Sequence, residues 1–508
     1  MEFVNGVKLY GNPLFPCMFL FISFVIIFYL QLAKTKKKLN LPPSPPWLPI
    51  IGNFHQLGKL PHRSLRNLAS KHGPLLLLQL GHNPTLVVST AEMAEKVIKS
   101  HDVAFSSRPK TTAANTLLYG CTDVGFAPYG EYWRQVRKLS VVELFSHKRV
   151  ESFQFVRDEE VELLVNKIRK ASINGQTVNL TKMVFSVSNN IVSRCAIGRK
   201  IEEEHEDGGK FSELARRVMA LLASFSIGDA FPYLWWMDYL TGFIPKLKAT
   251  SAELDELLDQ IIEERKDSDE VNPKKDFLSI MLELQKDGEI EMELTQDNIK
   301  AILMDMFIGG TDTTSTTTEW LMAELLKHPN IMKKVQEEVR MVVGNKPKIE
   351  ADDINKMHYL KCVIKETLRL HPAVALLVPR QTSTTVKLFD YDIPSGITVF
   401  INAWAIQRDP RWWDKPEEFI PERFENNGVD FKGHDFQFIP FGCGRRRCPG
   451  LPFGVASVEY LSANLLYWFD WELCGGGSAE NLDMDEVYGL TVNKKIPLHL
   501  LPVSHLSV

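Results

Sequence analysis

The feature that most constrains the fold is a loop rich in glycine and arginine that presents one cysteine just before a long apolar helical pattern. The loop runs from Pro440 to Gly450, and the helical pattern runs from Leu451 to Trp468. A helix N-terminus, three neighbouring arginines and nearby backbone N–H groups all favour a thiolate at Cys448. Gly444 and Gly450 let the backbone approach a large flat object. The loop therefore predicts a thiolate ligand for haem iron.

The loop also carries a recognisable pattern, Phe-x-x-Gly-x-Arg-x-Cys-x-Gly, at Phe441, Gly444, Arg446, Cys448 and Gly450. This pattern resembles the haem-binding signature of the cytochrome P450 family, and every fixed position matches. The resemblance implies that the cofactor is haem b (iron protoporphyrin IX), that Cys448 is its iron ligand, and that Phe441 and Gly450 contact it. Cys443 lies outside the ligand position and is expected to pack in the interior.

A membrane anchor is expected at the N-terminus. Leu14 to Ala33 is an uncharged apolar run of 20 residues, long enough to span a bilayer, and lysines follow it at once. The positive-inside rule then places the rest of the chain on the cytosolic side. A cleaved signal peptide is the alternative, but the run is long for one and lacks a small-residue cleavage site. We expect residues 1–33 to form an anchor in the endoplasmic reticulum membrane, with Leu14–Ala33 as its single transmembrane helix.

Residues 34–53 are expected to form a basic and proline-rich hinge. Four prolines fall within positions 42–46, and this density favours a stiff extended spacer. A ligand for a proline-binding module is the alternative. Residues 54–508 are then expected to form the haem-thiolate catalytic domain.

Composition excludes some classes of protein. The chain has 508 residues and a net charge of −4, so no basic field suggests a nucleic-acid partner. Its seven cysteines are odd in number and scattered, which does not resemble a disulfide framework and favours a reducing compartment.

Helical periodicity dominates from about residue 60 onward. Helices are expected over 91–100, 156–170, 211–225, 252–266, 297–327, 330–343 and 359–370. Strand-like runs are short, at 75–80, 85–88 and 398–401. The fold class is therefore mostly α with a small β lobe, and the resemblance extends the cytochrome P450 fold over nearly the whole globular part.

The expected helix over 297–327 contains two adjacent glycines, Gly309 and Gly310, which cost roughly 1 kcal/mol each against alanine. Packing must therefore hold this helix, and the missing side chains leave room against a cofactor face. With Asp312 and Thr313, the run resembles the family's oxygen-activation motif. The resemblance implies that Thr313 donates a hydrogen bond to the bound dioxygen and that Asp312 relays protons.

Three charged residues are expected to fix the cysteine loop. Glu366 and Arg369 are spaced i, i+3 and so share a helix face, and Arg423 lies in the run Pro-Glu-Arg-Phe. Taken alone, the spacing is typical of a surface ion pair. The resemblance implies instead a buried structural triad of Glu366, Arg369 and Arg423.

Four residues are expected to hold the haem propionates. Trp133 and Arg137 are spaced i, i+4 and resemble the family's Trp-x-x-x-Arg element. The resemblance also assigns Arg446 and Arg380 to propionates, and the guanidinium fork suits a carboxylate. A plain surface position is the alternative for Arg137 and Arg380.

The residues of these motifs resemble those of plant A-type microsomal P450s. This implies a monooxygenase that oxidises, and usually hydroxylates, a lipophilic specialised metabolite such as a terpenoid, phenylpropanoid or alkaloid. Electrons come from NADPH through a membrane-bound P450 reductase. Apolar residues in the segments that line the family's pocket, such as Leu117, Phe225 and Leu490, agree with a lipophilic substrate. A haem-thiolate isomerase or dehydratase without a reductase, and a non-catalytic haem-binding membrane protein, remain alternatives.

Overall fold

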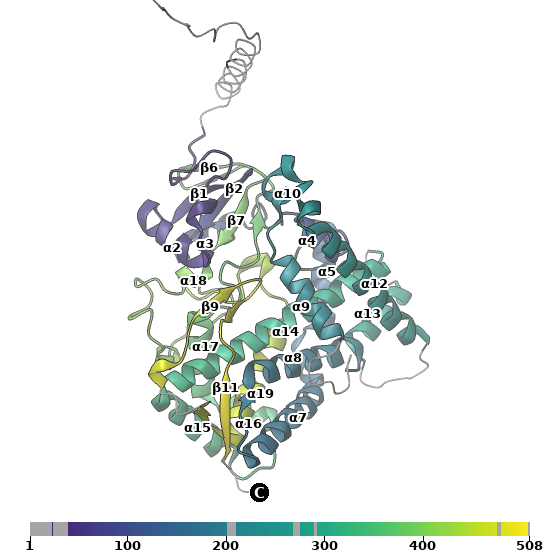
Figure 1. The fold of residues 1–508 in the computed structure, drawn as a ribbon, viewed down its shortest axis with the longest axis vertical. Helices are drawn as coiled ribbons and strands as arrows, with labels where there is room; N and C mark the ends of the chain where they lie inside the picture. Colours follow the sequence, from purple (N-terminus) through teal and green to yellow (C-terminus); the bar gives the residue numbers. More distant parts are fainter. Residues whose placement is uncertain are drawn as a thin grey trace, which may run out of the picture.

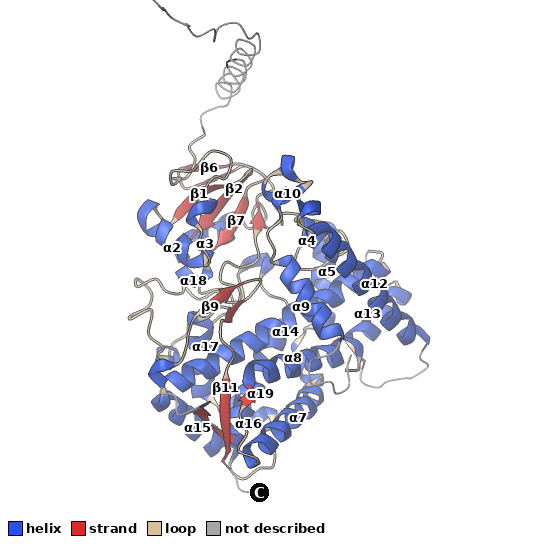
Figure 2. Ribbon diagram, in the orientation of Figure 1, coloured by secondary structure: helices blue, strands red, loops and turns tan. Residues whose placement is uncertain are grey.

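The computed structural model describes residues 23, 39–200, 210–267, 275–288, 292–474 and 479–505. It contains a small β lobe at the N-terminal end and a larger helical part (Figures 1 and 2). The fold is mostly helical with small sheets, as the sequence predicted.

The β lobe is built on a four-stranded sheet in the order β1-β2-β7-β4. Its strands are β1 (Leu75–Leu80), β2 (Asn83–Val88), β7 (Thr398–Ile401) and β4 (Arg380–Gln381). β1 and β2 form an antiparallel hairpin, whereas β2 pairs in parallel with β7. On one face of the sheet, Leu76 and Leu78 pack with Leu65. On the other face, Leu75 and Leu86 belong to a second cluster of buried apolar residues. Burial on both faces explains why these strands are continuously apolar in sequence.

The remaining strands form three small sheets. β5 (Val386–Leu388) pairs with β6 (Tyr391–Ile393), and β9 (Glu486–Tyr488) pairs with β10 (Val492–Lys494). β11 (His499–Ser504) lies between β3 (Val178–Asn179) and β8 (Phe469–Leu473). The last two sheets bring the C-terminal segment back onto the helical part.

The helices follow one another along the chain. The first part of the chain contributes α2 (Pro61–His72), α3 (Ala91–His101), α4 (Thr112–Leu117), α5 (Glu131–Leu139), α6 (His147–Ser152), α7 (Gln154–Ile173), α8 (Leu180–Ile197), α9 (Lys210–Leu222), α10 (Ile227–Ala230), α11 (Met237–Leu240), α12 (Phe243–Asp267) and α13 (Phe277–Asp287). The second half contributes α14 (Gln296–Lys327), α15 (Pro329–Val343), α16 (Ala351–Lys356), α17 (His358–Leu370), α18 (Ala403–Ile406) and α19 (Leu451–Trp468).

The long helix α14 runs through the centre of the helical part, where it packs on α8, α17 and α19 (Figure 1). A capping box starts it, because the Thr295 hydroxyl accepts from the Asn298 N–H and the Asn298 side chain accepts from the Thr295 N–H. Most of its side chains are buried, so packing on neighbours compensates for the two glycines. α14 thereby reaches the interior beside the helix that follows the cysteine loop.

Residues 39–53 lie against the β lobe. The Leu77 N–H donates to the Pro43 carbonyl at 2.9 Å, and Gly52 forms a β-bridge with Leu80. A Cβ at Gly52, whose φ is +64°, would lie 1.9 Å from the Gln79 carbonyl oxygen, so only glycine fits there. The prolines thus lead directly onto the outer strand of the sheet.

The predicted anchor, Leu14–Ala33, lies outside the described residues except for Ser23. Within the part of the chain that the structure describes, no helix combines the length and apolar character needed to cross a bilayer. The anchor therefore stays a prediction.

Candidate active site

The loop before α19 carries Cys448, and a hydrogen bond within the loop backbone fixes its conformation. The Cys448 N–H donates to the Phe441 carbonyl at 2.9 Å, which closes the loop between these two residues. Gly442 and Gly444 have φ values of +70° and +68°, which favour glycine. A Cβ at Gly444 would lie 2.6 Å from Ile98 of α3, so the close packing also requires glycine.

The two cysteines of the loop differ in surroundings. Cys443 is fully buried in the β-lobe core, and burial raises its pKa to about 11. Burial also raises the pKa of Cys448, although the N–H groups of Gly450 and Leu451 and the charge of Arg137 lower it. The helix start and the arginines thus act in the expected direction but are outweighed by burial. Coordination to a metal ion deprotonates such a thiol outright.

Arg446 and Trp133 meet beside the loop. The Arg446 guanidinium lies 4.1 Å from the centre of the Trp133 ring and donates to the carbonyls of Ser106 at 2.7 Å and Ala127 at 2.5 Å. Arg137, one turn after Trp133 on α5, donates to the Arg447 carbonyl at 2.5 Å. Two elements far apart in sequence, α5 and the cysteine loop, are joined here.

Arg380 and Arg108 complete a cluster of buried guanidinium groups. Arg380 donates to the Cys443 carbonyl at 2.8 Å and pairs with Asp102 at 3.3 Å. Arg108, which the sequence analysis did not identify, donates to the carbonyls of Gly125 and Val378 at 2.8 and 2.6 Å. Its place in a Ser-Ser-Arg-Pro run gave no local signal of this role.

These arginines repel one another. Burial, followed by the charges of Arg446 and Arg380, holds the pKa of Arg108 well below its usual value. Burial and the charge of Arg380 likewise lower the pKa of Arg446 to about 9. A buried excess of positive charge is stabilised by an anion, and guanidinium groups match carboxylates in geometry. The cluster therefore fits the two propionates of haem b.

The middle of α14 provides the facing wall. A Cβ added at Gly309 would meet no atom within 4 Å, so the helix presents open space at that turn. At Gly310 a Cβ would lie 2.8 Å from Val192, which holds α14 tightly against α8. The Thr313 hydroxyl donates to the Gly309 carbonyl at 2.5 Å, so it sits beside the open turn.

Asp312 is held by the C-terminal hairpin. The Thr491 hydroxyl donates to its carboxylate, and Asn493 donates to the Thr491 oxygen at 3.1 Å. Burial raises the pKa of Asp312, and the hydrogen bonds from Thr491 and Asn493 partly offset this. Thr491, in the hairpin turn, and Asn493, in β10, carry no sequence signature of this role.

Glu366, Arg369 and Arg423 do come together. Arg369 donates to both Glu366 oxygens at 2.7 and 2.8 Å, and Arg423 donates to Glu366 at 3.2 Å. The Glu366 and Arg369 side chains are fully buried. Arg369 also donates to the Gln407 carbonyl, and the Gln407 side chain accepts from the Ile439 N–H at 3.0 Å. Gln407, another residue the sequence did not reveal, thus connects this cluster to the start of the cysteine loop.

The apolar pocket candidates divide between core and surface. Leu117, Leu118, Ala375 and Leu376 are buried. Phe225 instead is 58% exposed, and its ring meets that of Phe54 edge-on at 5.3 Å. Phe225 therefore belongs to an outer aromatic surface in this structure.

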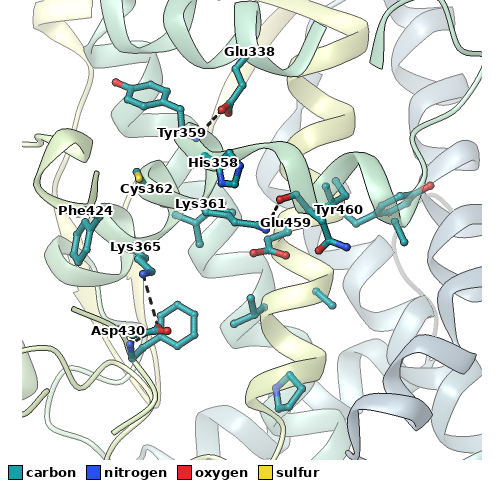
Figure 3. A pocket seen from close by; sticks show the side chains of 18 of the residues that line it. Glu338, His358, Tyr359, Lys361, Cys362, Lys365, Phe424, Asp430, Glu459 and Tyr460 are labelled. Atoms are coloured by element: carbon teal, nitrogen blue, oxygen red, sulfur yellow. Dashed lines mark hydrogen bonds and ion pairs between the residues drawn. The ribbon is translucent and has the colours of Figure 1, made fainter. Parts of the chain in front are cut away.

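A separate groove of about 1480 Å³ lies beside α19, between α15, α16, α17 and the segment 424–432 (Figure 3). Both basic and acidic side chains line it, with Lys365 4.0 Å from Asp430 and the Tyr359 N–H donating to Glu338 at 2.8 Å. The lining contains none of the residues proposed to hold the cofactor. It adjoins them through α19, whose first turns line the groove, and through Phe431, whose ring lies 5.3 Å from that of Phe441.

The comparison with protein families decides the assignment, since the model of the cytochrome P450 family matches residues 42–500. The chain belongs to the cytochrome P450 family. It is thus an oxidoreductase that incorporates one oxygen atom of dioxygen into its substrate. As a P450 it uses haem b, and its electrons come from NADPH through a reductase.

Similar curated P450s come from plants. A phenylacetaldehyde oxime monooxygenase of Prunus mume is 54% identical over 495 residues, covering 96% of this chain and 94% of the relative. Desmethylyatein synthase of Sinopodophyllum hexandrum is 49% identical, covering 97% and 99%. The tabersonine/lochnericine 19-hydroxylase of Catharanthus roseus is 46% identical, covering 93% and 94%.

Among solved structures, a zebra fish P450 with progesterone superposes with a TM-score of 0.76 at 25% sequence identity. The match covers 87% of this chain and 99% of that structure. The helical part and the β lobe thus follow the P450 fold.

Proposed function

We propose that this P450 hydroxylates a lipophilic plant specialised metabolite of the terpenoid, phenylpropanoid or alkaloid class. The observation that carries this is that Asp312, held by Thr491, and Thr313, beside the open turn, are adjacent on α14 in a chain that also presents Cys448. An isomerase needs no protons for oxygen reduction, so it has little use for such a pair. The plant relatives named as a phenylacetaldehyde oxime monooxygenase, a desmethylyatein synthase and a tabersonine/lochnericine 19-hydroxylase support the substrate class.

Each cofactor-facing residue has a proposed task. Cys448 would supply the thiolate ligand. Phe441 and Gly450 would line the same side of the loop as Cys448. The propionates would be neutralised by four arginines, Arg108, Arg137, Arg380 and Arg446. The Trp133 ring supports Arg446, whose guanidinium lies over it. When bound, haem supplies the redox chemistry that activates dioxygen and oxidises the substrate.

Proton supply falls to α14. The Asp312 carboxyl has a raised pKa, so it holds and releases a proton closer to neutral pH than an ordinary aspartate. Thr313 places a hydroxyl one residue further along the helix, and its bond to the Gly309 carbonyl fixes its direction. Together they carry a proton from the hairpin side of α14 to the open turn.

We propose that the body rests on the endoplasmic reticulum membrane through one apolar surface. The outer aromatic surface consists of residues 47–51 and the exposed side chains of Phe225, Tyr233, Trp235, Trp236 and Leu240. The Phe54–Phe225 ring contact and the bond from the His82 N–H to the Ala230 carbonyl at 2.7 Å join its two parts. Exposed tryptophan and tyrosine are typical of a membrane–water interface.

Membrane topology is tested with protease added to intact microsomes. We expect digestion of the globular part, because the anchor within residues 1–33 leaves it on the cytosolic face. Asn179, in the run Asn-Leu-Thr, is a glycosylation acceptor only in the lumen. A protected protein glycosylated at Asn179 contradicts this topology.

We propose that the reductase binds on the side of the cysteine loop. Lys138 and Arg445 are exposed there, and Arg447 bonds to the Lys432 carbonyl beside them. Positive charge steers an acidic partner mainly through the association rate, and salt screens it. Neutralising Lys138, Arg445 and Arg447 should slow reduction at low salt and much less at high salt. Unchanged kinetics at low salt exclude this surface.

The catalytic proposal is tested with membranes that contain the protein and a plant P450 reductase. A panel of terpenoids, phenylpropanoids and alkaloids is incubated with these membranes, with and without NADPH. The product masses are measured by mass spectrometry. We expect a product heavier by one oxygen atom, formed only with NADPH. A product isomeric with its substrate and formed without NADPH contradicts a monooxygenase role for this site.

A further inference from the structure

A short loop, residues 122–127, connects the α4 region to α5 and lies between α14 and the buried arginines. Its carbonyl oxygens accept hydrogen bonds from three of the proposed cofactor-holding side chains, Trp133, Arg446 and Arg108. The bond lengths are 3.0, 3.3 and 2.8 Å. The position of this loop therefore sets the position of those side chains.

The N–H groups of the same loop bind two carboxyl groups. Asp305 of α14 accepts from the Val124 N–H at 2.5 Å and from the Gly125 N–H at 3.3 Å. Asp123 accepts from the Phe126 N–H at 2.7 Å. One carboxyl thus comes from the loop itself and the other from the central helix.

The two carboxyl groups also meet each other. A Cβ at Gly125 would lie 3.1 Å from an oxygen of Asp123 and 3.2 Å from one of Asp305, and the other Asp123 oxygen, Oδ1, is buried without a hydrogen-bond partner among the described residues. Asp123 is fully buried. Two ionised carboxylates repel at this range, whereas a pair with one shared proton attracts.

The surroundings favour the protonated pair. Burial raises the pKa of Asp123 to about 6, and burial together with Asp123 raises that of Asp305 well above its usual value. The charged groups facing the pair are the cations Arg108 and Arg446, and Tyr132 and Cys121 face it as neutral groups. The two arginines are already engaged by carbonyl oxygens.

We propose that Asp123 and Asp305 share one proton and act as a latch that holds the 122–127 loop on α14, so that Trp133, Arg446 and Arg108 stay positioned for the cofactor's acidic groups. Both are positioning residues and touch no reacting atom. The proposal rests on the proposed role of the arginines for its effect on haem, but the shared proton itself does not depend on that role.

The latch gives a pH dependence of definite sign. Both pKa values are raised in the folded protein. At neutral pH the folded protein therefore binds more protons than the unfolded chain does. Rising pH therefore weakens the latch until the second carboxyl ionises and repels the first. Loss of the loop contacts should then speed haem release at alkaline pH.

The test measures haem transfer from the full-length holoprotein to excess apomyoglobin between about pH 6 and pH 9. Asp305→Asn keeps an acceptor for the loop N–H groups and donates to Asp123, so it mimics the protonated state at every pH. Asp305→Leu removes both abilities. Asp297→Asn, an exposed carboxyl on the same helix, is the matched control. Infrared difference spectra follow the carbonyl stretch of the protonated carboxyl.

We expect wild type and Asp297→Asn to release haem roughly tenfold faster at the alkaline end, the effect of about one pKa unit. Asp305→Asn should release it slowly at every pH and lack the titrating infrared band, and Asp305→Leu should release it fast throughout. If Asp305→Asn keeps the wild-type pH slope and band, no proton is shared and the proposal is overturned. If the band titrates as expected but haem release is flat in wild type, the shared proton stands and the link to the cofactor is wrong.

Discussion

The hydroxyl of Thr491 donates a hydrogen bond to the carboxylate of Asp312, across 179 positions of the chain. The C-terminal hairpin thereby holds the acid that the central helix carries. Leu490, which is expected to line the substrate pocket, lies in the turn of the same hairpin, so proton supply and substrate binding share one structural element.

Removing the Thr491 hydroxyl should move the pH profile. A hydrogen bond to the charged form lowers a carboxyl pKa, so Thr491→Val should raise that of Asp312 further above its ordinary value. We expect the limb of the turnover profile that reports Asp312 to shift to higher pH, with a loss of activity of about tenfold at neutral pH. Thr491→Ser, which keeps the hydroxyl, should retain the wild-type profile. Identical profiles for Val and Ser variants exclude this role.

Thr313→Ala should uncouple the enzyme without stopping electron supply. Its hydroxyl sits at the open turn of α14, so its loss should leave haem binding normal while less product forms per NADPH oxidised and more peroxide appears. Thr318→Ala is the matched control, because Thr318 makes the same bond to the carbonyl four residues earlier but is fully buried. Wild-type coupling in Thr313→Ala contradicts the assignment.

Breaking the buried charge cluster should destabilise the fold. Glu366→Gln leaves Arg369 without its carboxylate partner in a fully buried place, at a cost of about 3–5 kcal/mol. Glu418→Gln removes a solvent-exposed pair with Lys415 and should cost less than about 1 kcal/mol. Denaturant unfolding measures both. Equal losses for the two variants would show that the cluster contributes no more than a surface pair.

A second pH effect comes from Glu324. Burial opposes its ionisation, but hydrogen bonds from His328 and His371 prevail and lower its pKa to about 2 from 4.5. Its stabilising contribution is thus complete above pH 4.5 and is lost as pH falls towards 2. Glu324 in turn raises the pKa of His328 above 6.5, so that contribution is complete below 6.5 and lost as pH rises through the raised value.

The stability difference between wild type and Glu324→Gln should therefore be largest between about pH 4.5 and 6.5. Urea unfolding at a series of pH values measures it. A difference that stays constant from acid to alkaline pH is incompatible with the ion pairs described.

Local patterns let the sequence predict much of the fold. The helices over 297–327 and 359–370 were confirmed within one residue at each end, since a capping box at Thr295 marks the start of the first and one apolar face marks the second. Helix α8 was missed, since Ser188, Asn189 and Ser193 are buried among its apolar residues and blur the period. The strands β9 and β10, with three residues each, are too short to carry a period of their own.

The site divides in the same way. The cysteine loop and the Gly-Gly-Thr-Asp-Thr run are contiguous, so their residues are visible in the sequence. Arg108, Gln407 and Thr491 act through contacts with segments more than 15 positions away, which only the folded chain brings together. Side-chain bonds to backbone carbonyls, as at Arg108, depend on tertiary position and leave no pattern in the sequence.

The most direct test of the account is the spectrum of the reduced protein with carbon monoxide, compared between Cys448→Ala and Cys443→Ala. The two cysteines are five residues apart, but Cys443 is buried in the β-lobe core while Cys448 lies two residues before the N-cap of α19. We predict that Cys448→Ala loses the thiolate-type band and that Cys443→Ala keeps it. A thiolate-type band that survives in Cys448→Ala and disappears in Cys443→Ala would contradict the assignment of the iron ligand, and with it the site built around that ligand.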